Sequence, residues 1–126
     1  MNTTRFTRGM IVLAELNGEG CQQQGVRPCT IIGNDKGNEH SPLLIVSPLT
    51  SRDKKYMPTH ALIHPTRENG LTVKSTVLTE QIITLNKTSV KKILGCLSDY
   101  DLRKVNSEIK AVKNNFAMEI DDADYD

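Results

Sequence analysis

The chain has few aromatic residues and no tryptophan. Its aromatic side chains are Phe6, Tyr56, Tyr100, Phe116 and Tyr125. Proteins that bind single-stranded nucleic acids regardless of sequence usually stack bases on several aromatic side chains. The composition therefore disfavours a stacking platform of that kind.

Cysteines and long apolar runs are also scarce. Cys21, Cys29 and Cys96 are an odd number without a C-x-x-C pair, which favours reduced thiols over a disulfide framework. No apolar run is long enough to cross a membrane, and the N-terminus lacks the apolar segment of a signal peptide. We therefore expect a cytoplasmic protein that does not associate with membranes.

The sequence has no convincing metal or serine-hydrolase motif. His60 and His64 are four residues apart, as in a helical zinc site, but no glutamate follows His60, and Pro58 and Pro65 bracket the segment. There is no G-x-S-x-G motif either. We expect packed or surface histidines, no metal and no cofactor.

Acidic charge is concentrated at the C-terminus. Residues 119–126 contain five acidic side chains and no basic one, although the whole chain has a formal charge of only +1. Residues 1–118 contain sixteen basic side chains against ten acidic ones, a formal charge of +6. A basic body suits a polyanion ligand. We expect residues 119–126 to form a mobile, solvated tail, and the alternative is that they fold back and mimic RNA.

Short apolar segments separated by glycine and proline dominate the chain. They predict strands at Met10–Leu16, 28–32, 43–46, 59–63, 73–78 and 82–85, with a turn at 33–38. Leu102, Val105, Ile109, Val112 and Phe116 share one helical face, which predicts a helix over 98–115 with Ser98 as its N-cap. We therefore expect a single mostly β domain over residues 1–118, a small barrel with a C-terminal helix.

Polar side chains gather at the ends of three apolar segments, within residues 20–28, 48–51 and 75–81. They include Arg27, Thr50, Ser51, Ser75 and several glutamines. Because Pro28 favours an extended backbone before it, Arg27 is held where a flexible loop meets a strand. A guanidinium binds phosphate oxygens through a fixed pair of donors.

An arginine with neighbouring hydroxyls can assist RNA cleavage without a metal. The ribose 2′-hydroxyl attacks the adjacent phosphate, so the site must align the attack, stabilise negative charge and manage two proton transfers. Arginine and hydroxyl groups supply the first two, but a guanidinium holds its proton too tightly to be a good general base. The alternatives without a catalytic role are a surface arginine and a Ser/Thr turn.

The order of several short motifs resembles the MazF/PemK family of bacterial toxins. The motifs are Arg8-Gly9, Arg27-Pro28, residues 34–38, Ser41-Pro42, residues 48–51, residues 58–60, residues 75–78 and residues 80–82. The resemblance implies an SH3-like barrel that forms a homodimer and cleaves single-stranded mRNA at selected sequences without metal. It leaves a 2′,3′-cyclic phosphate and a 5′-hydroxyl. It also implies a MazE-like antitoxin, whose disordered C-terminal segment covers the RNA site.

The resemblance assigns roles to individual residues. It makes Arg27 and Thr50 catalytic. The side chains that it brings to the RNA are Gln22, Gln23, Ser51, Lys54, Lys55, Tyr56, Ser75 and Gln81.

The chain also departs from the usual family pattern. Met10, Gln22, Ile83 and Asn86 stand where an aspartate, a glutamate, an arginine and an aspartate are usual. These changes affect the expected recognition sequence more than the chemistry. Two alternatives stay open: a barrel toxin that inhibits a protein such as DNA gyrase, and an inactive family member.

Overall fold

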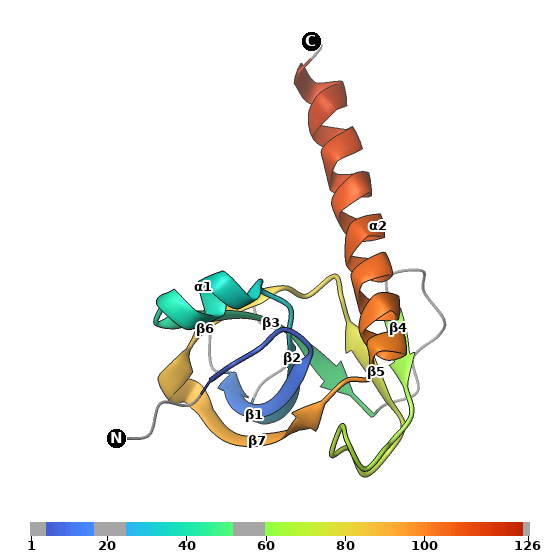
Figure 1. The fold of residues 1–126 in the computed structure, drawn as a ribbon. Helices are drawn as coiled ribbons and strands as arrows, with labels where there is room; N and C mark the ends of the chain where they lie inside the picture. The colour runs from blue at the N-terminus through green and yellow to red at the C-terminus, as the bar shows by residue number, and fades with distance from the viewer. Residues whose placement is uncertain (1–4, 17–24, 52–59, 125–126) are drawn as a thin grey trace.

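The protein is a strongly curved antiparallel sheet with one short and one long helix (Figure 1). The computed structural model describes residues 5–16, 25–51 and 60–124, with α2 side chains as far as Lys113. The strands are β1 (Met10–Leu16), β2 (Gly25–Ile31), β3 (Leu43–Thr50), β4 (His60–Ile63), β5 (Ser75–Leu78), β6 (Ile83–Asn86) and β7 (Val90–Cys96). The helices are α1 (Asp35–His40), the 3-10 turn η1 (Lys87–Ser89) and α2 (Asp99–Asp124). The predicted class, mostly β with a C-terminal helix, is confirmed.

Strand β3 joins the two halves of the sheet. The strand order is β4-β5-β3-β2-β1-β7, and β6 pairs with the first half of β3. Residues Leu43 to Val46 of β3 pair with β6, whereas Leu49 and Thr50 pair with β5. We predicted that β3 ends at Val46, before Pro48, but it continues to Thr50. Pro48 lies between the two paired stretches, where no described strand pairs with that edge of β3 and a missing N–H is tolerated.

A turn, rather than strand pairing, spans the gap between the ends of the sheet. Strands β4 and β7 are the two end strands, and the segment after β4 reaches β7. The Cys96 N–H donates to the Glu68 carbonyl oxygen at 2.8 Å. A Cβ on Gly70 would collide with the Leu94 carbonyl oxygen, and one on Gly95 would collide with the Glu68 carbonyl oxygen. Two glycines therefore let the turn and β7 lie backbone against backbone.

Two hydrophobic clusters form the core, one on each face of the β1–β2 pair. The first fills the inside of the curved sheet and includes Val12, Cys29 and Leu44. The second includes Ile11 and lies beneath α2. Its other buried members are Ile32, Leu49, Ala61, Ile63, Leu71, Val77, Leu97 and Val105.

Helix α2 begins as predicted and extends further than predicted. The Ser98 side-chain oxygen accepts from the Asp101 N–H at 3.1 Å, which confirms the N-cap. Val105 is buried, and Leu102 and Ile109 pack against the second cluster, as the apolar stripe indicated. The helix continues past Asn115 to Asp124 and projects from the barrel (Figure 1), so residues 119–124 of the acidic segment are helical. In the described residues, no helix is long and apolar enough to cross a membrane.

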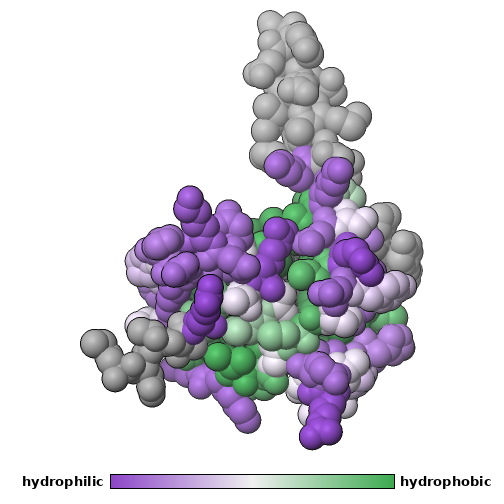
Figure 2. Space-filling view, in the orientation of Figure 1, coloured by the Kyte–Doolittle hydropathy of each residue, from purple (hydrophilic) through white to green (hydrophobic). Residues whose placement is uncertain are grey.

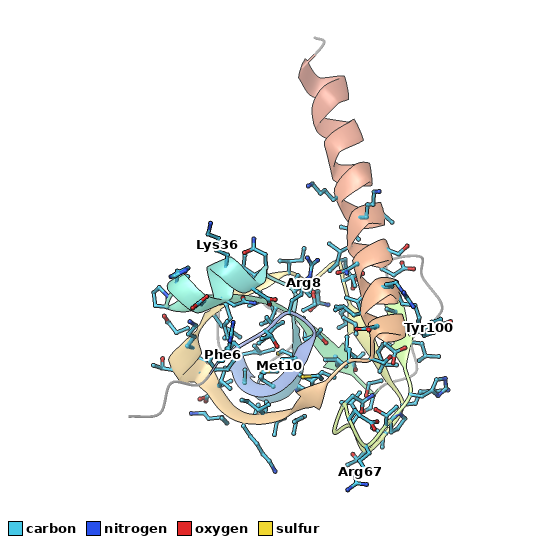
Figure 3. All side chains as sticks on the ribbon, viewed as in Figure 1. Phe6, Arg8, Met10, Lys36, Arg67 and Tyr100 are labelled. Carbon is cyan, nitrogen blue, oxygen red and sulfur yellow. The ribbon has the colours of Figure 1, made fainter. Side chains whose placement is uncertain are left out.

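Arg8 and Gly9 connect α2 and α1 to the sheet. The Arg8 guanidinium donates to Asn106 Oδ1 on α2 at 2.7 Å, and its backbone N–H donates to Asp35 Oδ1 at 2.7 Å. Figure 3 shows Arg8 between the two helices. Gly9 has a φ of 91°, and a Cβ there would lie 3.3 Å from the Leu102 side chain. The Arg8-Gly9 motif therefore has a structural role, because it links both helices to the sheet.

Three elements were missed by the sequence prediction: α1, β7 and the short η1. We predicted only a turn at 33–38, but α1 begins there because Asn34 caps it, accepting from the Gly37 N–H at 2.7 Å. Strand β7 was not predicted, because Lys91, Lys92 and Ile93 are all exposed and break the alternation expected of a strand. Strand β5 begins at Ser75 rather than at Val73, and β6 is shifted by one residue from our prediction.

We expect Gly70→Ala to destabilise the protein much more than Gly25→Ala. Both glycines have positive φ, 70° and 81°, so both alanines are strained by about 1–2 kcal/mol. A Cβ at Gly25 meets no atom within 4 Å, whereas one at Gly70 meets the backbone of β7. The clash should cost about 1–3 kcal/mol more. Urea unfolding of both variants measures this difference, and equal losses of stability would contradict the account of the turn.

Candidate active site

Four of the predicted site residues line one cavity, of about 290 Å³. They are Arg27 from β2, Thr50 at the end of β3, Ser51 directly after it, and Ser75 at the start of β5. The other lining residues are Leu13, Pro28, Leu49, Gly70, Leu71, Thr72, Val73 and Leu94. Residues far apart in sequence therefore meet at one hollow, as the prediction requires.

The two hydroxyls from β3 and β5 are held by strand pairing. Thr50 pairs with Thr76 and is only 7% exposed. Ser75 pairs with Ile63 of β4 and is 4% exposed, and its hydroxyl donates to the Val73 carbonyl oxygen at 3.0 Å. We predicted Thr50 just past the end of a strand, but it is the last residue of β3, and its pairing with β5 fixes its position.

Arg27 lies at the open side of the cavity. It pairs with Ala14 of β1 and is exposed to solvent. Gly25, with its positive φ, begins the strand, and Pro28 restricts the backbone after Arg27. The guanidinium is thus attached to a fixed strand while remaining accessible to a ligand.

Arg27 is the one ionisable side chain among the described residues that line the cavity. The other polar side chains that line the cavity are the hydroxyls of Thr50, Ser51, Thr72 and Ser75. This set can bind an anion and donate hydrogen bonds to it. In the described part of the chain, no group of three His, Cys, Asp or Glu side chains is arranged to hold a metal ion.

A turn that the sequence reasoning did not associate with the site forms one wall of the cavity. Asn69 is 1% exposed, and its side chain organises this turn. Its Oδ1 accepts from the N–H groups of Thr66 at 3.0 Å and Leu71 at 2.9 Å, and its Nδ2 donates to the His64 carbonyl oxygen at 2.9 Å. The Asn69-Gly70 dipeptide is a turn signal that could have identified this wall.

The other predicted site residues are not placed in the cavity. Gln81 lies between β5 and β6, where its N–H donates to the Leu78 carbonyl oxygen at 2.9 Å, and it does not line the cavity. Gln22, Gln23, Lys54, Lys55 and Tyr56 lie outside the described residues. His60 begins β4 and His64 follows the last residue of that strand, so the backbone there is not the helix that a zinc motif needs.

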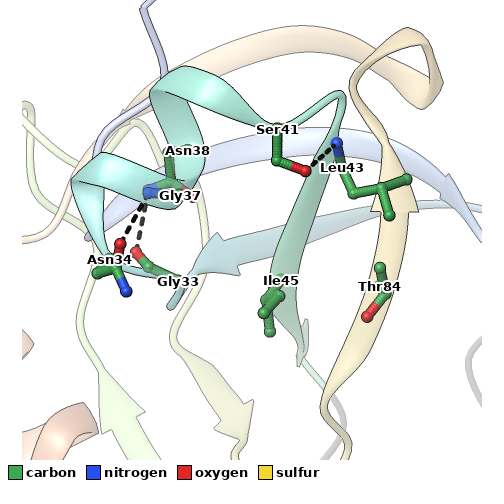
Figure 4. Close-up of a pocket in the computed structure, with 8 residues that line it drawn as sticks. All are labelled: Gly33, Asn34, Gly37, Asn38, Ser41, Leu43, Ile45 and Thr84. Atoms are coloured by element: carbon green, nitrogen blue, oxygen red, sulfur yellow. Dashed lines mark hydrogen bonds between the residues drawn. The ribbon is translucent and has the colours of Figure 1, made fainter.

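A smaller pocket beside α1 has no ionisable side chain among its described lining residues (Figure 4). Its volume is about 190 Å³. Asn34 and Ser41 already accept backbone N–H groups there, from Gly37 and Leu43 respectively. Its polar groups therefore stabilise α1 and the start of β3, and the larger cavity is the better candidate for chemistry.

Comparison with known proteins agrees with this geometry. The model of the PemK-like, MazF-like toxins of type II toxin–antitoxin systems matches residues 7–112. The chain belongs to this family. It is also 42% identical over 104 residues to Endoribonuclease MazF of Staphylococcus saprophyticus, an alignment that covers 81% of this chain and 86% of the relative.

Solved structures of the PemK/MazF family share the fold. MazF from Deinococcus radiodurans matches with a TM-score of 0.75 at 22% identity, over 89% of this chain and 99% of that one. A mycobacterial endoribonuclease in complex with its cognate antitoxin matches with a TM-score of 0.72 at 23% identity, over 86% and 94% of the two chains. The predicted barrel class is thus confirmed by structures as well as by sequence.

We expect Asn69→Ala to destabilise the protein by about 2 kcal/mol or more, because two backbone donors and one acceptor lose their partner in a buried turn. Thermal and urea unfolding measure the loss. Asn86→Ala is the control, since Asn86 is exposed and its side chain makes no capping bond to η1. If the two variants were equally stable, Asn69 would not organise the turn.

Proposed function

We propose that this endoribonuclease toxin cleaves single-stranded mRNA in the cavity between Arg27 and Thr50. The cleavage is sequence-selective and needs no metal. One observation carries the proposal: the cavity combines a single guanidinium with hydroxyl groups from four residues. That combination suits a phosphodiester, whose charge is negative and whose oxygens accept hydrogen bonds.

In the proposed step, the ribose 2′-oxygen forms a bond to phosphorus and the bond from phosphorus to the 5′-oxygen breaks. The products are a 2′,3′-cyclic phosphate and a 5′-hydroxyl. Arg27 binds the non-bridging oxygens and stabilises the charge that develops on them, while the Thr50 hydroxyl donates a further hydrogen bond. The 2′-hydroxyl loses a proton and the 5′-oxygen gains one, so the reaction balances without a co-reactant.

The fixed positions of these groups contribute to the rate. Thr50 is set by its pairing with Thr76, and Arg27 by its strand and the following proline. An aligned attack needs the reacting atoms held in one geometry, and rigid elements provide that better than loops do. Ser51 and Ser75 border the same cavity and are proposed to contact the RNA, together with Gln81. Gln22, Gln23, Lys54, Lys55 and Tyr56, which lie outside the described residues, are proposed to do the same.

We also propose the partners and location of the chain. The mycobacterial and Deinococcus structures include complexes of an endoribonuclease with its cognate antitoxin and of MazF with MazE. By analogy, a MazE-like antitoxin would cover the Arg27 cavity with an extended C-terminal segment.

We propose a homodimer in the cytoplasm, where mRNA is available. Exposed Leu43 and Ile45 on β3 are apolar surface that a second copy can bury, and Figure 2 shows further apolar surface near the foot of α2.

We expect Arg27→Ala to lower the cleavage rate by about 10²–10³-fold, because one charge-stabilising group is lost from the transition state. The assay incubates purified protein and EDTA with a long mixed-sequence RNA, and the new 5′ ends are mapped by sequencing. Arg103→Ala is the control, since Arg103 is an exposed arginine on α2. Cuts by Arg27→Ala at the wild-type rate would remove Arg27 from the mechanism. If folded wild-type protein makes no cuts, a gyrase inhibition assay follows.

We expect Thr50→Val to slow cleavage strongly and Thr50→Ser to retain part of the rate. Valine keeps the shape of threonine without its hydroxyl, whereas serine keeps the hydroxyl in a smaller side chain. Single-turnover rates on an RNA that carries the mapped site compare the three proteins. A valine variant that cleaves at least as fast as the serine variant would contradict a role for the Thr50 hydroxyl.

A further inference from the structure

Three lysines line an open hollow of about 500 Å³ beside β7. They are Lys87, Lys91 and Lys92, and the apolar lining of the hollow includes Phe6 and Ile93. The hollow has no acidic lining residue among the described ones. It has more basic lining side chains than the Arg27 cavity or the pocket beside α1.

The three lysines differ in which groups lie near their ammonium nitrogens. Lys91 Nζ lies 3.6 Å from Glu15 Oε2, and Lys87 Nζ lies 5.9 Å from the centre of the Phe6 ring. No described carboxylate lies within ion-pair distance of Lys92, whose side chain is exposed. Lys92 is therefore the lysine whose charge is most available to an anionic ligand.

The lysine hollow and the Arg27 cavity share a strand. Lys92 pairs with Leu13 across β1 and β7, and paired residues of antiparallel strands point to the same face. Leu13 lines the Arg27 cavity, as does Leu94, two residues after Lys92 on β7. A chain that leaves the cavity over β1 and β7 thus meets Lys92 next.

We propose that the lysine hollow binds phosphate groups of the RNA strand outside the cleaved position, with Lys92 as the main contact. The identity of the ligand rests on the proposed function, since the strand must be the one held in the Arg27 cavity. Lysine binds a phosphate as a point charge and reads no base. The hollow therefore increases affinity for longer RNA and does not select the sequence that is cut.

The test measures binding of RNA that cannot be cut. Random-sequence 2′-O-methyl RNAs lack the attacking hydroxyl, and lengths of about 5 and about 15 nucleotides span the site sizes of single-strand binders. Dissociation constants are measured over a series of salt concentrations for wild type, Lys92→Gln and Lys36→Gln. Lys36 is an exposed lysine on α1 that lines neither hollow and points away from the barrel (Figure 3), so its loss matches the change in net charge.

We expect wild type to bind the longer RNA more tightly and with a steeper salt dependence. Lys92→Gln should lower the slope of log affinity against log salt by about 0.7 for the longer RNA, because each phosphate contact on a single strand releases about that many counterions. It should also lose part of the affinity gained on lengthening. Lys36→Gln should keep the wild-type slope.

An unchanged slope in Lys92→Gln, or the same change in both variants, would overturn the proposal. Binding of oligoglutamate, a model acidic peptide, is measured alongside. If Lys92→Gln lost oligoglutamate binding but kept its RNA binding, the proposal would also be overturned, and the hollow would be assigned to an acidic peptide. Binding and cleavage are scored separately. A Lys92-dependent slope in a protein that cuts no RNA would support the hollow and refute the proposed cleavage.

Discussion

The contact between the turn at 66–71 and β7 is the constraint on which the cavity depends. Gly70 and Gly95 allow the two backbones to approach, and the Cys96 N–H donates to the Glu68 carbonyl oxygen across the gap. Without this contact the curved sheet would be open between its end strands. Gly70 and Leu94 would no longer face Arg27 and Thr50 across one hollow.

The site that results is chemically simple. The exposed Arg27 guanidinium and the buried hydroxyls of Thr50 and Ser75 are brought together by β2, β3 and β5, and the turn adds a wall. Since β3 pairs with β2 on one edge and with β5 on the other, the distance between Arg27 and Thr50 is set by the sheet itself. Membership of the toxin family and the fold agree with a role in which positioning and charge stabilisation dominate.

Much of the fold could be predicted from the sequence, because the apolar segment of β1 and the stripe of α2 are regular, although β2 begins at Gly25 rather than at Pro28. Strand β7 could not, since Lys91, Lys92 and Ile93 are exposed and its place depends on a glycine contact with a distant turn. Helix α1 was not predicted because its glycine and asparagine residues are typical of a turn, and the capping role of Asn34 is evident only in the structure. For the site, Arg27, Thr50, Ser51 and Ser75 came from motif order, whereas the wall made by Leu13, Leu94 and the turn is a tertiary feature.

The most direct test of the central claim is a crystal structure of the protein with an RNA that carries a 2′-O-methyl group at the mapped cleavage site. The account predicts that the phosphate at that site lies in the Arg27 cavity. Its non-bridging oxygens would be about 3 Å from the Arg27 guanidinium and from Thr50 Oγ1. A bound RNA whose cleavable phosphate lies elsewhere, with Arg27 and Thr50 contacting no part of it, would contradict the account.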